Sequence, residues 1–197
     1  MPTMEEIKKL RELTGAGIMD VKAALGESGG DTQKAIEFLR KKGAASAVKK
    51  SGRDAKEGWI GSYIHSNGKI GVIVEINCET DFVARNADFQ DFAKTIAMQV
   101  AATDPLVVKP EDVSDELINK EKEIAIEQLK AEGKPEAMFD KILEGKMKKF
   151  REEKALVTQP FIKDQDKTIA DLLSEAVSKL GENIQIGRFK RIEIGKE

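Results

Sequence analysis

Apolar residues in the first 43 positions recur at helical spacing in three short stretches that glycines separate. These stretches are Ile7, Leu10 and Leu13; Ile18, Val21 and Leu25; and Ala35, Ile36 and Leu39. Thr3 and Glu6 form a capping box before the first stretch, and Asp31 stands where it can cap the third. We therefore expect three helices in an N-terminal module at residues 1–43. A module this short buries too little surface to be very stable by itself, so we expect it to serve mainly by presenting a face to another part of a complex.

Residues 44–57 are rich in Ala, Lys, Ser and Gly, and we interpret them as a basic connector. Residues 34–56 contain eight basic residues against two acidic ones. A solvated linker is the ordinary reading of such a stretch, but contact with RNA phosphates or with an acidic partner also fits.

A β-hairpin is predicted after the connector, where apolar and polar residues begin to alternate with a period of two residues. The strands are Trp59–His65 and Ile70–Glu79, and Asn67-Gly68 between them favours a tight turn with positive φ angles. The apolar face of the second strand is formed by Ile70, Val72, Val74, Ile76 and Cys78.

The rest of the chain returns to helical spacing before a last strand. Asn86 can cap a long helix, two further helical stretches lie within 111–154, and Thr168 begins another that Gly181 ends. Residues 184–194 alternate as a strand whose change of phase near Phe189 indicates a bulge. The predicted fold class is α+β: the helical module, then a core at 58–197 of about three antiparallel strands packed against helices.

The composition excludes several kinds of binding site and cofactor chemistry. The 197 residues include 33 basic and 35 acidic ones, so the net charge of −2 argues against a surface devoted to nucleic acid, and we expect no direct nucleic-acid binding. One cysteine (Cys78) and one histidine (His65) rule out an internal disulfide and a thiolate or histidine metal cluster. No stretch is apolar enough for a membrane span, and a cytoplasmic protein without cofactor or metal is expected.

Two glycine-rich motifs are weak candidates for catalysis or nucleotide binding. Residues 26–30 match the G-x-S-x-G pattern around Ser28, but a nucleophile elbow needs a strand before it, and here a helix is predicted. The glycines of 14–17 lack the Gly-Lys-Ser/Thr sequence of a phosphate-binding loop. We expect no catalytic residue in this chain.

Residues 80–83, Thr-Asp-Phe-Val, lie where a core strand gives way to a helix. The alternation of the strand does not say where Phe82 points. It can be a core contact, or an exposed aromatic beside a carboxylate, which is typical of an anchor at a protein interface.

Three blocks of sequence resemble the translation elongation factor Ts family. They are Leu10 to Leu25 with its Thr14-Gly15-Ala16-Gly17 centre; Lys41 to Ala44; and Asn77 to Ala84. The order of helices and hairpin agrees over essentially the whole chain. The resemblance implies a ubiquitin-associated-like N-terminal module, and a guanine-nucleotide exchange factor for elongation factor Tu that carries no catalytic residue of its own.

The resemblance also implies which residues touch the partner. Thr80, Asp81, Phe82 and Val83 match the segment by which the family disturbs the magnesium site of elongation factor Tu, with Phe82 as the wedge and Asp81 on a neighbouring loop. Arg11, Ile18 and Met19 match positions by which the N-terminal module docks near the nucleotide pocket. This chain has one copy of the segment at 63–75 that longer relatives repeat, which implies a homodimer.

Two rivals from other classes remain. One is a ubiquitin-associated-like adaptor or ribosome-binding module that uses residues 34–56, for which steep salt dependence with RNA is expected. The other is a serine hydrolase, which would lose its activity on Ser28→Ala.

Overall fold

The structure is a computed structural model and describes residues 2–196. The described residues form two compact units. The first contains the chain up to Ala101 together with the residues from Ala170 onward, and the second contains Ala102–Ile169.

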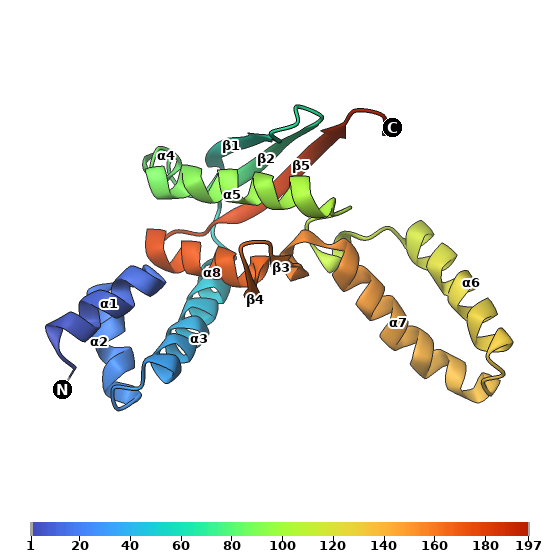
Figure 1. Cartoon of the computed structure of the whole chain (residues 1–197), viewed down its shortest axis with the longest axis horizontal. Coiled ribbons are helices and arrows are strands. Elements are labelled where there is room, and N and C mark those ends of the chain that lie inside the picture. Colours follow the sequence, from blue (N-terminus) through green and yellow to red (C-terminus); the bar gives the residue numbers. More distant parts are fainter. Residues whose placement is uncertain (1, 197) are drawn as a thin grey trace. The chain divides into compact units, whose positions relative to one another are not determined.

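The first unit begins with α1 (Met4–Thr14), α2 (Ile18–Glu27) and α3 (Thr32–Lys50), shown in blue in Figure 1. Thr3 and Glu6 form the expected capping box, and the Asp31 carboxylate accepts hydrogen bonds from the first backbone N–H groups of α3. Gly15, in the left-handed region at φ 66°, ends α1. Their shared core contains Ile7, Leu10, Val21, Ala24, Leu25 and Ala35. The helices predicted for this stretch are confirmed.

The third helix is longer than the glycine at position 43 suggested. α3 continues through Gly43 to Lys50, so the first half of the expected connector at 44–57 is helical. The alanines and lysines of this half have high helix propensity. Gly43 is buried, and a Cβ built on it would stand 3.7 Å from the carbonyl oxygen of Ser174 in α8. This is an ordinary van der Waals distance, so the helix continues through Gly43 because of the helix-forming residues that follow it.

The sheet of the first unit is antiparallel, in the order β1 (Glu57–Ile64), β2 (Ile70–Cys78), β5 (Gln185–Glu193). The predicted hairpin turn is present, with Gly68 at φ 67°. Val74 pairs with Phe189 but Ile76 pairs with Ile186, so β5 carries an extra residue. The predicted hairpin, last strand and bulge are confirmed.

Helix α5 (Ala87–Thr103) covers one face of this sheet (Figure 1). Asn86 accepts a hydrogen bond from Asp88 N at its start, as predicted. A Cβ built on Gly61 of β1 would lie 2.8 Å from the backbone of Ala93, so only glycine permits the helix to approach the strand this closely. Val72, Val74 and Ile76 of β2 are buried on the same face.

Two shorter elements complete the first unit. The single helical turn α4 (Asp81–Ala84) lies between β2 and α5, and α8 (Ile169–Leu180) leads into β5. Gly181, at φ 80°, ends α8 as expected, and its N–H donates to the carbonyl of Val177.

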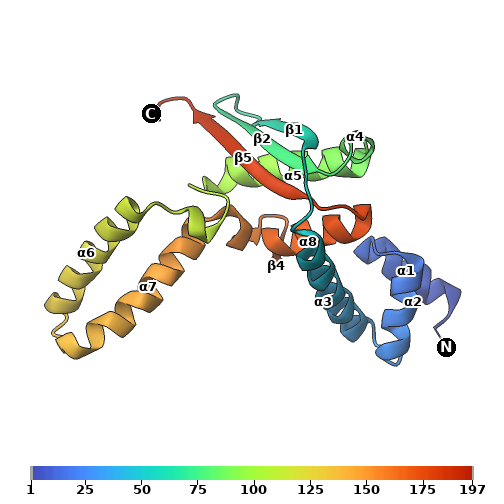
Figure 2. The same cartoon turned by 180° about the vertical axis from the view of Figure 1, so that it is seen from behind.

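The second unit is built on an antiparallel helical hairpin of α6 (Asp115–Ala131) and α7 (Phe139–Lys154), which lie side by side in Figure 2. Its small core contains Ala125, Leu129 and Leu143. Short 3-10 turns lie at Pro110–Asp112, Glu136–Met138 and Leu156–Thr158. A two-stranded ladder of β3 (Pro160–Phe161) and β4 (Asp164–Thr168) was not predicted, because β3 is too short and β4 too polar to give a period.

The architecture is α+β, with N-terminal helices followed by an antiparallel sheet of three strands packed with helices, as the sequence pattern predicted. Within residues 2–196, none of the helices has the length and apolar character needed to cross a bilayer.

Candidate partner-binding site

The turn that carries Phe82 is built at the end of β2. Thr80 has an extended backbone and acts as the N-cap of α4, where its hydroxyl accepts from Val83 N at 3.4 Å. The carbonyl of Thr80 accepts from Ala84 N at 3.2 Å. Ala84 is buried beneath the turn, so α4 is fixed to the core on its Ala84 side.

Phe82 points into solvent, with 83% of its surface exposed. A phenylalanine in the core would be nearly inaccessible, so the core-contact interpretation is wrong and the exposed-aromatic interpretation holds. A large apolar ring held in water on a short, fixed turn is the kind of side chain that contributes most when a partner buries it.

The neighbours of Phe82 are less exposed. Asp81 is half-buried, and its carboxylate forms an ion pair at 3.1 Å with the Arg85 guanidinium one turn later. Thr80 and Val83 are also half-buried. Phe82 is therefore the prominent side chain of the predicted segment at 80–83.

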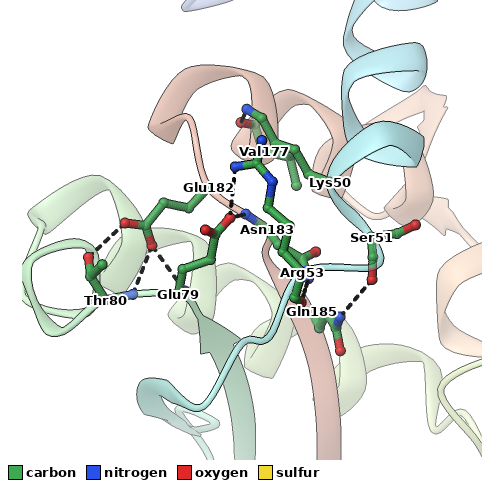
Figure 3. Close-up of polar contacts among 9 residues, drawn as sticks. All are labelled: Lys50, Ser51, Arg53, Glu79, Thr80, Val177, Glu182, Asn183 and Gln185. Carbon is green, nitrogen blue, oxygen red and sulfur yellow. Dashed lines mark hydrogen bonds and ion pairs between the residues drawn. The ribbon is translucent and has the colours of Figure 1, made fainter.

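A polar network lies behind this turn and joins segments far apart in the sequence (Figure 3). The Glu182 carboxylate accepts from Glu79 N at 3.0 Å, from Thr80 N at 3.1 Å and from the Thr80 hydroxyl at 2.6 Å. The Glu79 carboxylate accepts from Asn183 N at 2.6 Å and lies 3.4 Å from an Arg53 nitrogen. Sequence patterns gave no signal for this network, because Glu182 lies in the loop between α8 and β5, outside any periodic segment and about a hundred residues from Glu79.

Cys78 lies next to the same turn and is fully buried. Burial is the main cause that raises the pKa of its thiol to about 11, and the nearby Glu182 charge adds to the rise. The thiol donates a hydrogen bond to the Thr80 carbonyl at 3.1 Å. It therefore stays protonated near neutral pH and behaves as the small buried hydrophobe that its strand position predicted.

Arg11, Ile18 and Met19 lie where α1 gives way to α2, and all three are exposed, Met19 by 74%. Leu13 was placed on the apolar stripe of its helix, but 62% of its surface is exposed. This junction therefore displays more apolar surface than the sequence pattern indicated.

The N-terminal junction and the Phe82 turn belong to the same compact unit, and Lys179 of α8 connects their surroundings. A Cβ built on Gly15, between α1 and α2, would lie 3.6 Å from the Lys179 side chain. The Lys179 ammonium forms an ion pair at 2.9 Å with Asp88 at the start of α5. The Lys179 side chain thus lies close to the α1–α2 junction and pairs with the first turn of α5.

The arrangement around Ser28 differs from that of a nucleophile. Ser28 follows α2, and its hydroxyl donates to the Leu25 carbonyl at 3.3 Å. His65 belongs to the β1–β2 hairpin, where its Nδ1 lies 3.2 Å from the Tyr63 hydroxyl. A helix–turn–helix at the serine is not the strand–turn–helix of a nucleophile elbow. Over the described part of the chain, no three His, Cys, Asp or Glu side chains form a group that could hold a metal ion.

Comparison with known proteins gives a consistent result. A family model described as Elongation factor TS matches residues 33–196. The chain is 56% identical over 191 residues to the elongation factor Ts of Solidesulfovibrio magneticus, covering 97% of this chain and 96% of that protein. It is 56% identical over 190 residues to that of Desulforamulus reducens (96% and 88%), and 55% identical over 196 residues to that of Carboxydothermus hydrogenoformans (100% and 90%).

Together with the α+β fold and the exposed aromatic turn, these matches define a translation elongation factor. The chain belongs to the elongation factor Ts family.

Proposed function

We propose that this protein is the guanine-nucleotide exchange factor for elongation factor Tu and promotes release of GDP during translation elongation. The observation that carries the proposal is Phe82, an aromatic side chain 83% exposed on a turn that hydrogen bonds fix to the core. Such a factor acts in the cytoplasm, where translation takes place, and needs no catalytic residue, cofactor or metal of its own.

The proposed mechanism weakens nucleotide binding by disturbing the magnesium site of the partner. Phe82 wedges between side chains of elongation factor Tu near its magnesium ion, while Asp81 contacts a neighbouring loop and Thr80 and Val83 hold the turn. Because magnesium bridges protein and phosphate oxygens, displacing its ligands weakens nucleotide binding. By thermodynamic linkage, bound nucleotide lowers the affinity for the exchange protein by the same ratio, so each ligand promotes dissociation of the other.

The N-terminal module supplies a second contact. Arg11, Ile18 and Met19 dock near the nucleotide pocket, and their exposure at the α1–α2 junction supports this role. We retain the division into a helical module at 1–43, a basic connector at 44–57 and a core and dimerisation domain at 58–197. The α3 helix enters the connector as far as Lys50.

A homodimer belongs to the same proposal. The sheet has a second face, in front of α5 in Figure 2, that carries exposed isoleucines. They are Ile60, Ile64, Ile73 and Ile192, assigned to this face by the strand register. A second copy that places the same face against this one would bury these side chains in an isologous interface.

The test is release of a fluorescent GDP analogue from elongation factor Tu. We expect strong acceleration by the wild-type chain and a loss of roughly tenfold or more on Phe82→Ala, because a central aromatic anchor contributes about 2 kcal/mol or more. Met138→Ala is the matched control, since Met138 is also an exposed apolar side chain but lies in the turn that joins α6 and α7. Circular dichroism checks that all variants fold alike.

Each outcome decides something different. Unchanged acceleration with Phe82→Ala would keep the exchange function but remove the wedge. No acceleration by the wild type would contradict the function and favour an adaptor or ribosome-binding module acting through residues 34–56, for which binding to RNA would fall steeply with salt.

A further inference from the structure

Glu182 occupies an unusual position for a residue at the end of a helix. Gly181 reverses the chain after α8, and the next side chain reaches the end of β2, more than a hundred residues earlier. Its Oε2 accepts from the backbone N–H groups of Glu79 and Thr80, which lie beyond the last residue of β2. The carboxylate therefore replaces the sheet ladder for two backbone groups that directly precede the Phe82 turn.

The other carboxylate oxygen acts on the turn itself. Oε1 of Glu182 accepts from the Thr80 hydroxyl at 2.6 Å, and the same hydroxyl oxygen accepts from Val83 N at 3.4 Å. The hydrogen bond to Glu182 fixes the rotamer of Thr80, and the Thr80 oxygen caps the turn that holds Phe82. Figure 3 shows the hydrogen bonds from Glu182, just after α8, to Glu79 and Thr80. The bond from Val83 N to the Thr80 hydroxyl continues this chain to the backbone after Phe82.

The next residue, Asn183, extends the network to the segment that follows α3. Asn183 is buried, its N–H donates to the Glu79 carboxylate at 2.6 Å, and its Nδ2 donates to the Arg53 carbonyl at 2.7 Å. The end of β2 and the loop after α8 are therefore joined in both directions: Glu182 accepts from the backbone of Glu79 and Thr80, and the Glu79 carboxylate accepts from the backbone of Asn183. Gly181, at φ 80°, turns the chain so that this loop reaches the strand end.

We propose that Glu182 is a positioning residue for nucleotide exchange: it holds the turn that presents Phe82, without touching the partner or the nucleotide. This inference rests on the proposed exchange function and adds a residue to it. The binding free energy of an exposed aromatic side chain is fully available only if its backbone already has the bound geometry, because ordering a loose turn on binding costs free energy. Charge-assisted hydrogen bonds to consecutive backbone groups supply that order.

The central experiment is a double-mutant cycle in the GDP-release assay, with Glu182→Gln, Phe82→Ala and the double variant. Glutamine keeps the shape of the side chain but places an amide N–H₂ where one acceptor oxygen stood. We expect Glu182→Gln to lower the maximal rate roughly tenfold, because small displacements of a positioned group are costly. We expect the double variant to be no slower than Phe82→Ala alone, because Glu182 acts through Phe82.

Glu116→Gln is the matched control. It also replaces an ion-paired carboxylate by an amide, in the pair with Lys120 on α6, and it should leave the maximal rate within twofold of wild type. The concentration of factor that gives half-maximal acceleration should change less for Glu182→Gln than the maximal rate does.

Amide hydrogen exchange of the free protein provides a readout that needs no partner. In Glu182→Gln we expect faster exchange at residues 79–83 and unchanged exchange in the middle of β2 and in α5. A rise throughout the sheet would show general destabilisation and overturn the positioning role.

Three further results would overturn the inference. They are a maximal rate equal to wild type in Glu182→Gln, an effect that adds fully to that of Phe82→Ala, and unchanged amide exchange at residues 79–83. Failure of the wild type to accelerate GDP release is a different result, because it rejects the exchange function while amide exchange still reports whether Glu182 holds the turn.

Discussion

Helices α5 and α6 have the same length, 17 residues each, but they are stabilised in different ways. One side of α5 is buried against the sheet along nearly its whole length. Its buried residues are Phe89, Phe92, Ala93, Ile96, Ala97, Gln99, Val100 and Ala101. The buried residues of α6 are Ala125 and Leu129.

The local interactions at the start of the two helices are similar: Asn86 caps α5, which has the acidic residue Asp88 in its first turn. α6 has a Ser114 N-cap, acidic residues in its first turn and an ion pair at 2.8 Å between Lys120 and Glu116. Such pairs contribute only a few tenths of a kcal/mol each. A similar helical period therefore produces a tightly packed helix in the first unit, and in the second a helix that depends more on capping and propensity.

The largest effect is expected in the packed helix. Ile96→Ala removes a fully buried side chain between α5 and the sheet and should lower the free energy of unfolding by about 3 kcal/mol. Denaturant unfolding of the first unit measures this loss. Ile124→Ala, at an exposed position of α6, is the control and should change stability by less than about 0.5 kcal/mol. Equal losses in the two variants would contradict the comparison.

The next effect tests whether the hairpin opens on its own. Leu129→Ala removes one of the few buried side chains between α6 and α7 and should lower the stability of the hairpin by about 2 kcal/mol. Amide hydrogen exchange should rise in α6 and α7 while the sheet stays protected. A parallel rise in β2 would show that the hairpin and the sheet unfold together.

A stabilising change should act in the same hairpin. Gly145 lies inside α7, is exposed and has no atom within 4 Å of the place where a Cβ would stand. Gly145→Ala should therefore stabilise α7 by about 0.5–1 kcal/mol through helix propensity. Gly61→Ala, where the Cβ would meet Ala93 at 2.8 Å, should destabilise the first unit. Thermal unfolding of both variants tests this contrast.

The smallest effect is expected on acidification of the N-terminal helices. The Thr3 N–H lowers the pKa of Glu6, and the Lys34 N–H lowers the pKa of Asp31. Because each pKa is lower in the folded chain, the stabilisation is complete above the ordinary values and is lost as the pH falls through the lowered ones. Helix content by circular dichroism should thus fall slightly below about pH 4.

Asp31→Asn separates this effect from general acid unfolding. Asparagine caps a helix about as well as aspartate but does not titrate, so the variant should lose less helix content in acid. An identical acid profile for the variant and the wild type would contradict the role of the Asp31 carboxylate.

The sequence predicted elements whose signals are local. Asn67-Gly68 marked the hairpin, the change of phase near Phe189 marked the bulge, and Thr3 with Glu6 marked the first helix. Gly43 was misleading, because the alanines and lysines after it have high helix propensity and continue α3 to Lys50.

The candidate site was predictable in its position but not in its geometry. The alternation of β2 ends before Phe82, so only the tertiary structure shows that the ring is exposed. Leu13 has the spacing of a core residue, yet the neighbouring helices leave it uncovered. The contacts of Glu182 with Thr80 join residues about a hundred positions apart, and no local period reports on such a pair.

The burial of Cys78 has a practical consequence for spectroscopy. It is the single cysteine of the chain, and its thiol is protonated and inaccessible in the folded state. A cysteine introduced at an exposed position would therefore be the one thiol to take up a dye or spin label. Distances between labelled sites in the α6–α7 hairpin and the sheet then become measurable without first removing a native residue.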